Sequence, residues 1–149
     1  MKDKVGLKIN KQENMSKLKK ILLGIGAVLL IFVVIQIINA AKYSMVVQVV
    51  EGENIMGINP LAERLDFGDL SRNNGMTRYV TFKSSGGTPV YIAAFKFGEI
   101  SDLVKMDKNF FTLNPGEEMK ISFEIKIPPS AEFRHYSGSV WIFRIPKFF

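Results

Sequence analysis

The stretch MKISFEIKI, residues 119–127, gives the clearest fold signal in the chain. Apolar residues at every second position alternate with lysine, serine and glutamate. A period of two predicts a β-strand with one face in a hydrophobic core and the other face in water. The pair Pro128-Pro129 ends the strand, because proline has no N–H to donate to a sheet ladder.

Six further segments outside this stretch read as short strands separated by turn residues. They span residues 43–51, 64–67, 76–84, 90–97, 110–113 and 137–146. The segment SGGTP at 85–89 predicts a turn in which Gly86 and Gly87 supply positive φ, and residues 51–61 read as a long loop. About seven strands with frequent turns and no helix after residue 42 predict an all-β, Ig-like antiparallel β-sandwich.

Two groups of motifs carry a family resemblance over about residues 62–146. LDFGDL (65–70) with TRYVTFKSSGGTPVYI (77–92) resembles the opening of Ig-like domains of the ASH/major-sperm-protein type. LNPGEEMKISFEIKIPPS (113–130) with YSGSVWI (136–142) is similar to the closing half of prokaryotic surface Ig-like domains. The resemblance implies structural roles for three glycines: Gly68 ends a strand, Gly116 serves the turn after Pro115, and Gly138 starts the last strand tightly.

The segment before these strands, KLKKILLGIGAVLLIFVVIQIINAAK (17–42), is predicted to be a membrane anchor. Residues 21–41 form an apolar run of about 31 Å as a helix, close to the hydrocarbon thickness of a bilayer. A cleaved signal peptide is the alternative, but its apolar region is usually shorter and Asn39-Ala40-Ala41 is a poor cleavage site. The layout is similar to archaeal pilins and archaellum accessory proteins, yet the junction at which prepilins are processed is missing.

Charge predicts the orientation of this anchor. The net charge is +6, and residues 1–20 carry seven lysines against Asp3 and Glu13, whereas residues 41–149 carry 13 basic and 12 acidic side chains. The positive-inside rule therefore places a basic tail, residues 1–20, in the cytoplasm and residues 42–149 outside it. Lys17, Lys19 and Lys20 are expected to contact lipid head groups, and Gln36 is a candidate contact with another helix inside the membrane. Translation from Met15 would also give a compact anchor.

The outer domain offers little that could carry catalysis. The chain has no cysteine and one histidine, His135, which falls in a loop before a strand. Asp66 and Asp69 could approach a Ca²⁺ ion, but turn capping by Asp69 is the favoured interpretation. No nucleophile elbow, phosphate loop or zinc ligand set is visible, so we expect no enzyme activity, no metal and no cofactor. The near-neutral domain also gives no indication of nucleic-acid binding.

Two predicted strand segments, residues 90–97 and 140–145, are apolar on both faces. This is unusual for a sandwich in which one face of each sheet lies in water. Either the loop 51–61 covers the second faces, or they form an exposed patch that docks a partner. The candidate docking residues are Tyr91, Phe95, Phe97, Trp141, Phe143, Phe148 and Phe149.

These observations favour a single-pass protein of the cell membrane with an extracytoplasmic domain. Its expected function is that of a non-catalytic interaction or structural subunit of an envelope or membrane protein assembly, as a homo- or hetero-oligomer. Two alternatives stay open: a glycan or surface-polymer binding module, and a pilin-like filament subunit. The aromatic residues that would serve glycan binding are Tyr43, Tyr91, Tyr136 and Trp141.

Overall fold

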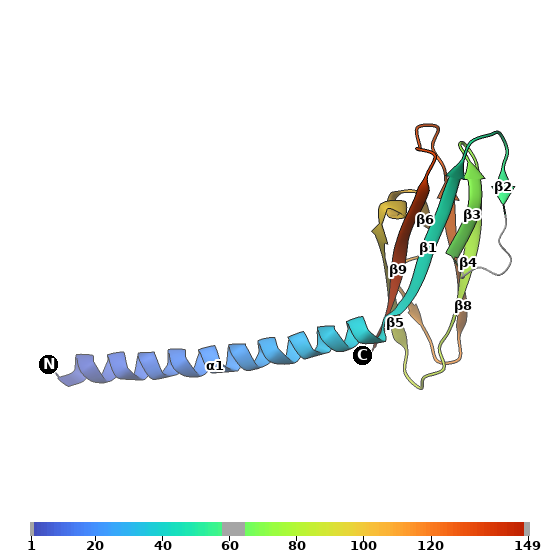
Figure 1. Cartoon of the computed structure of the whole chain (residues 1–149). Coiled ribbons are helices and arrows are strands. Elements are labelled where there is room, and N and C mark those ends of the chain that lie inside the picture. The colour runs from blue at the N-terminus through green and yellow to red at the C-terminus, as the bar shows by residue number, and fades with distance from the viewer. Residues whose placement is uncertain (1, 58–64, 148–149) are drawn as a thin grey trace. The chain divides into compact units, whose positions relative to one another are not determined.

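The computed structural model describes the backbone of residues 2–57 and 65–147 and the side chains of residues 17–57 and 65–147. The chain divides after Ile38 into two compact units, an N-terminal helix and a β domain. The described residues form one α-helix, nine strands and one turn of 3-10 helix, labelled in Figure 1.

The helix, α1, runs from Lys2 to Asn39. Its segment Lys17–Asn39 is long and apolar enough to cross a membrane, and none of its most apolar stretch is buried by protein. Apolar side chains lie on all sides of this segment, so it needs an apolar environment around it. The helix ends at Asn39, two residues before the end of the predicted anchor at 41, because the backbone of Ala41 already pairs with Ile142 in a strand.

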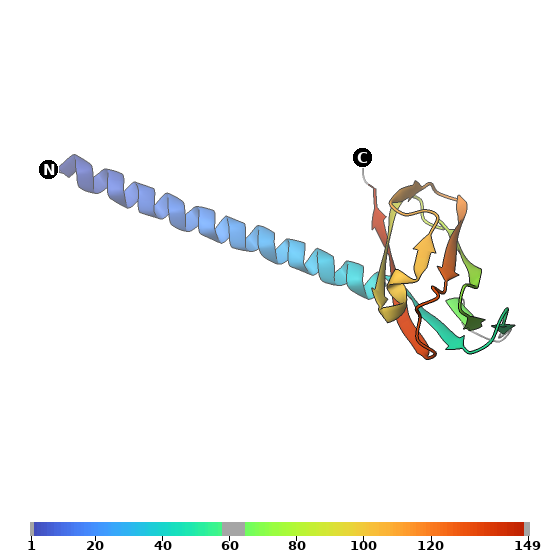
Figure 2. The ribbon, with the colours of Figure 1, turned by 90° about the horizontal axis from the view of Figure 1, so that it is seen from above.

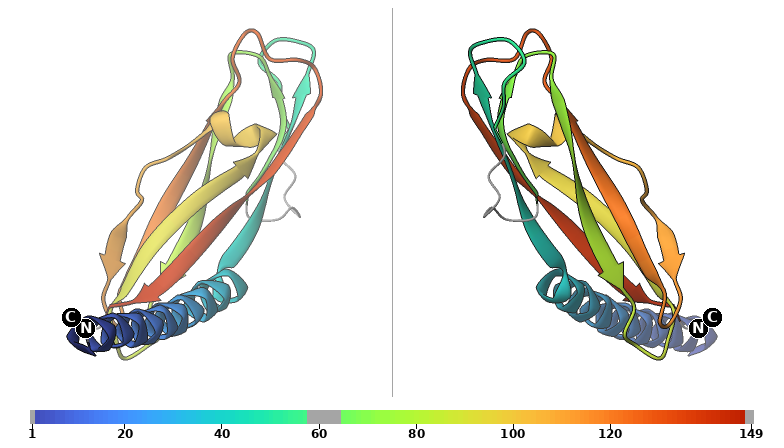
Figure 3. Two further views of the ribbon diagram at one scale, coloured as in Figure 1. Left: turned by 90° about the vertical axis from the view of Figure 1, so that its left-hand side faces the viewer. Right: turned by 90° about the vertical axis from the view of Figure 1, so that its right-hand side faces the viewer.

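The strands of the β domain form two sheets. The larger sheet has the order β2-β3-β1-β9-β5-β7, and the smaller has the order β4-β8-β6. Figure 2 and Figure 3 show these two layers from further directions, and the left panel of Figure 3 shows β7, β5, β9 and β1 side by side. The bounds are β1 Ala41–Val50, β2 Met56–Gly57, β3 Leu65–Ser71, β4 Gly75–Lys83, β5 Val90–Gly98, β6 Val104–Met106, β7 Phe111–Leu113, β8 Glu118–Lys126 and β9 His135–Pro146.

The core lies between the sheets, and the alternation in the stretch 119–127 builds one wall of it. Ile121, Phe123 and Ile125 of β8 are fully buried, as their period of two predicts. They pack with residues of the larger sheet such as Phe67 and Ile142. The prediction of a β-rich domain with two packed sheets is therefore confirmed.

One strand pair differs from the antiparallel arrangement predicted. β1 and β3 pair in parallel, and their register shifts between Val46 and Gln48. The extra residue lies in β3, where Gly68 has a φ of 67° and its N–H donates to Asp66 Oδ1 at 2.7 Å. Gly68 therefore forms a bulge and does not end the strand, which continues to Ser71.

Other local predictions need correction. β2 lies inside the predicted loop 51–61. β6 and the 3-10 helix η1 (Glu99–Asp102) were not predicted either. Segments of two to four residues are too short to show a periodic pattern of apolar residues. Gly86 and Gly87 are not among the residues with positive φ, whereas Gly116 is, with a φ of 77°. Asp66, in place of Asp69, caps the local turn, because its carboxylate faces the Gly68 amide.

Candidate functional site

The most distinctive surface of the β domain is the outer face of β5 and β9. Phe95 pairs directly with Trp141, Ala93 with Phe143 and Tyr91 with Ile145. Because residues two apart on a strand share a face, these pairs place their side chains together on the side away from the core. We call this surface the aromatic face; it comprises Tyr91, Phe95, Phe97, Phe110, Trp141 and Phe143.

The rings of the aromatic face pack edge to face against one another. The ring centroids of Phe97 and Trp141 lie 5.3 Å apart, and those of Phe95 and Phe143 lie 5.7 Å apart. The ring planes are inclined by 62° and 76°, and such edge-to-face pairs at these distances have a favoured aromatic geometry. The face is therefore an ordered ladder of rings across two hydrogen-bonded strands.

Four of the six residues of the aromatic face are exposed to solvent in the described part of the domain, and Trp141 and Phe143 are partly buried. Phe95 is 45% exposed, Phe97 48% and Phe110 53%, whereas Ile92 and Ile142 on the opposite face of the same strands are fully buried. The apolar character of both faces thus has two causes: one face builds the core, and the other is displayed. A displayed face of this kind is where partner-binding sites are commonly found.

The predicted covering loop does not supply a lid in its described part, residues 51–57. Ile55 exchanges two hydrogen bonds with Ser71, through its carbonyl oxygen and its N–H, and β2 pairs with β3. β3 lies beyond β1 and β9 from β5 in the larger sheet, so this part of the loop lies at the other edge. Residues 58–61 of the loop lie outside the described residues.

Phe110 belongs to this face and was not predicted as a site residue. Its φ is 56°, and its ring lies 6.0 Å from Phe95 in an edge-to-face arrangement. The neighbouring Asn109 holds it there, because the Asn109 amide accepts from Ala94 N–H at 2.8 Å and donates to Ala94 O at 2.9 Å. An asparagine before Phe-Phe is too short a sequence signal to predict that the Asn109 side chain binds the backbone of Ala94.

The remaining predicted site residues fall in several places. Phe148 and Phe149 lie outside the described residues. Lys17, Lys19 and Lys20 are exposed near the start of the apolar segment of α1, and Gln36 is partly exposed near its end. Lys42 was not predicted as a site residue, yet its Nζ lies 4.6 Å from the centre of the Trp141 ring, a cation–π contact at the edge of the aromatic face.

The four aromatic residues considered for glycan binding do not form one platform. Tyr43 packs against the core, 6.3 Å from the Phe82 ring. Tyr136 lies under the guanidinium group of Arg134, at 4.2 Å. Only Tyr91 and Trp141 share the aromatic face, so a stacking surface made from all four is not present.

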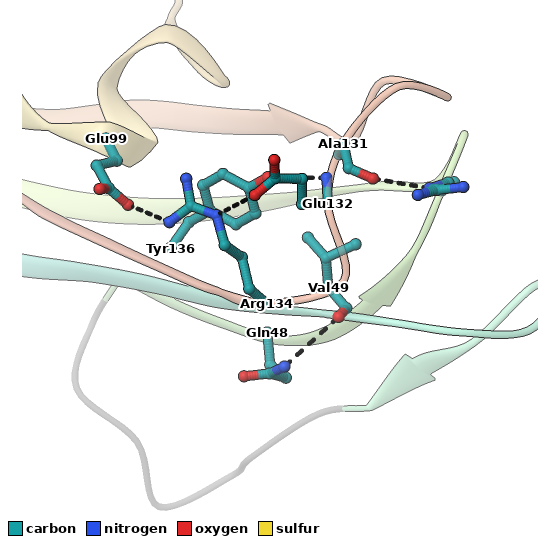
Figure 4. Close-up of polar contacts among 8 residues, drawn as sticks. Gln48, Val49, Glu99, Ala131, Glu132, Arg134 and Tyr136 are labelled. Carbon is teal, nitrogen blue, oxygen red and sulfur yellow. Dashed lines mark hydrogen bonds and ion pairs between the residues drawn. The ribbon is translucent and has the colours of Figure 1, made fainter.

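A polar cluster at the N-terminal end of β9, drawn in Figure 4, fixes the loop before this strand. Arg134 donates to Glu99 Oε2 at 2.6 Å and lies 3.0 Å from Glu132 Oε2. The hydrogen bond to Glu99 is the main reason that the pKa of Arg134 is raised, against a smaller opposing effect of desolvation. Glu132 N–H donates to the Tyr136 hydroxyl at 3.0 Å. These contacts are largely exposed and serve to hold the loop.

A hollow of about 360 Å³ is lined by the bulge region of β3 and by His135. Asp66 and Asp69 contribute carboxylates to it, but Asp66 already accepts from the Gly68 amide. Within residues 17–57 and 65–147, no three His, Cys, Asp or Glu side chains come together in a way that could hold a metal ion. The hollow therefore offers less defined chemistry than the aromatic face.

No protein-family model matches the chain, and no curated protein matches it in sequence.

Proposed function

We propose that the chain is a non-catalytic, membrane-anchored interaction or structural subunit of an envelope or membrane protein assembly. The observation that carries this proposal is the aromatic face, an ordered apolar surface on an otherwise well-packed β domain. The helix fixes the domain at a membrane, and the face binds a neighbouring protein there.

The exposed area of the aromatic face is large enough for such a role. A phenylalanine side chain has about 150–250 Å² to bury, and Phe95, Phe97 and Phe110 are each about half exposed. These three rings alone then present about 300 Å² of apolar surface. Patches of about 300–600 Å² are the largest on typical monomers and are often functional.

The edge of β5 beside this face is guarded against uncontrolled pairing. β7 pairs with β5 only at Val90–Ile92, and the Asn109 amide occupies the backbone groups of Ala94 further along. Because a guarded edge blocks strand addition, side-chain packing on the face is the favoured way to bind a partner. We infer that Phe95, Phe97 and Phe110 provide that packing.

We infer an Ig-like sandwich on a single-pass anchor, with the N-terminus in the cytoplasm and the β domain outside it. The two sheets, the antiparallel β1–β9–β5 core of the larger sheet and the lysines before the apolar helix support this interpretation.

A pull-down from membranes in mild detergent, with identification by mass spectrometry, tests the proposal. The wild-type chain is expected to recover the same membrane or envelope proteins reproducibly, and Phe95→Ser/Phe97→Ser to lose them. Tyr79→Ser is the matched control, because Tyr79 is 51% exposed on β4 of the smaller sheet. Recovery of the wild-type chain alone as a monomer, or equal losses in both variants, would contradict the proposal.

A further inference from the structure

The ribbon formed by β5 and β9 extends beyond the start of β1. Ala41, the first residue of β1, pairs with Ile142, and Ile142 pairs with Ala94. Four further pairs of β5 and β9 follow, from Ala93 with Phe143 to Val90 with Pro146. At about 3.4 Å per residue this extension is about 14 Å long. Its outer face carries Tyr91, Phe143 and Ile145.

The covalent chain limits the distance between Asn39, the last residue of the helix, and Lys42 in β1. Lys42 follows Asn39 by three residues, which span at most about 11 Å when fully extended. Lys42 is paired with Trp141 in the sheet. The 23-residue segment Lys17–Asn39 is about 35 Å long as a helix, which exceeds the hydrocarbon core of a bilayer. Asn39 then lies at the level of the lipid head groups.

The side chains at this end are of the types that favour a membrane–water interface. Tryptophan and tyrosine are enriched there because their rings are apolar and their tips are polar. Trp141 and Tyr91 lie beside Phe143 and Ile145 on one face, and Lys42 stacks on the Trp141 ring at 4.6 Å. A lysine with an apolar stem can extend its ammonium group toward lipid phosphates while the ring beneath it enters the interface.

The charge around the same end also favours anionic lipid. β4 and β8 reach it at the pair Lys83–Glu118, since Phe82 contacts Tyr43 near the start of β1. The basic side chains there outnumber the acidic ones by four to two: Lys42, Lys83, Arg144 and Lys147 against Glu117 and Glu118. A juxtamembrane cation contributes about fivefold to binding at an anionic surface.

We propose that Tyr91, Trp141, Phe143 and Ile145 rest in the head-group layer of the membrane that the helix spans. This contact orients the domain, so that the more exposed rings of Phe95, Phe97 and Phe110 face a neighbouring protein. The inference rests on the proposed role as a membrane-anchored subunit. The proposed partner of these four residues is lipid. The experiment below distinguishes lipid from a protein bound to the same residues.

Trp141 is the only tryptophan, so its fluorescence reports on this surface directly. The full chain is reconstituted into vesicles of phosphatidylcholine and phosphatidylglycerol that contain a head-group nitroxide lipid. Trp141 is expected to be strongly quenched by the nitroxide and protected from aqueous acrylamide. The matched control is Trp141→Phe/Tyr79→Trp, because Tyr79 is 51% exposed on β4 of the smaller sheet and pairs with Ser122. Its tryptophan is expected to show the opposite pattern.

A second variant tests the electrostatic part. Lys42→Gln/Lys147→Gln leaves the tryptophan in place and removes two cations, so the docking equilibrium should weaken by about fivefold for each. Quenching of Trp141 should then fall and should also fall in wild type as salt is raised. Equal quenching of the two tryptophan positions, or quenching that neither salt nor the double variant changes, would overturn the proposal.

The result separates this inference from the proposed function. If Trp141 stays unquenched in protein-free vesicles while Phe95→Ser/Phe97→Ser still abolishes partner recovery, the lipid contact is wrong and the subunit role stands. If Trp141 is quenched as expected and no partner is recovered in any detergent, the lipid contact stands and the subunit role fails.

Discussion

Replacing Gly138 with alanine should destabilise the β domain severely, because the backbone of β5 leaves no room for a Cβ atom at this point of β9. Gly138 pairs with Gly98, and a Cβ atom added at Gly138 would lie 2.2 Å from the carbonyl oxygen of Phe97 and 2.8 Å from Ile100 Cγ2. Ordinary carbon–oxygen contacts are about 1 Å longer than the first of these distances, and the obstructing atom belongs to backbone. The strand pair must therefore move apart.

The size of the effect follows from this geometry. Overpacking of a well-packed site costs about 1–3 kcal/mol, and a backbone obstruction places Gly138→Ala at the upper end, about 3 kcal/mol. For a domain of this length, that loss lowers the melting temperature by about 10–15 °C. Gly87→Ala is the matched control, because an added Cβ there meets no atom within 4 Å. Its effect should stay within about 0.5 kcal/mol.

Thermal unfolding of the full chain in detergent micelles, followed by Trp141 fluorescence, measures both variants. The tryptophan lies on β9, three residues from the substitution, and reports on the β domain without a contribution from the helix. Equal melting temperatures for Gly138→Ala and Gly87→Ala would refute the β5–β9 register. The aromatic face would lose its basis with it.

The buried core, the guarded edge of β5 and the orientation of the anchor can each be tested by substitution. Phe123→Ala should cost about 3–5 kcal/mol in urea unfolding, because Phe123 is fully buried, whereas Phe133→Ala, at a residue 48% exposed, should cost less than about 1 kcal/mol; equal losses would contradict the core assignment. Asn109→Leu removes both side-chain hydrogen bonds to Ala94 and should speed hydrogen exchange of the Ala94 amide by about tenfold, so unchanged exchange would count against the guarded edge. In the cysteine-free chain, Ser44→Cys should react with an impermeant maleimide on intact protoplasts and Ser16→Cys only after lysis; the reverse pattern would invert the proposed orientation.

The sequence predicted the β domain well where a single period dominates. The alternation in residues 119–127 identifies β8, and its apolar residues are the buried ones. The apolar run before residue 40 likewise identifies the helical segment long enough to cross a membrane. In both cases burial in the core or in lipid requires apolar side chains at regular positions along the whole segment, so the pattern can be recognised in the sequence.

Features that depend on pairing between distant segments could not be read in this way. The parallel pairing of β1 with β3 and the bulge at Gly68 depend on register, and LDFGDLS alone reads as a strand that stops at glycine. Phe110 joins the aromatic face only because Asn109 bonds to Ala94, 15 residues earlier. The sequence could show that β5 and β9 are apolar on both faces, but only their position in the larger sheet shows which face stays exposed.

The most direct test of the account is site-specific photo-crosslinking in native membranes from Phe97, with Tyr79 as the control position. Both side chains are about half exposed, Phe97 at 48% on the aromatic face and Tyr79 at 51% on the other sheet. The proposed docking surface predicts a discrete protein adduct from position 97 and none from position 79. A discrete adduct from 79 alone, or no adduct from either position, would contradict the claim that the aromatic face binds a neighbouring protein.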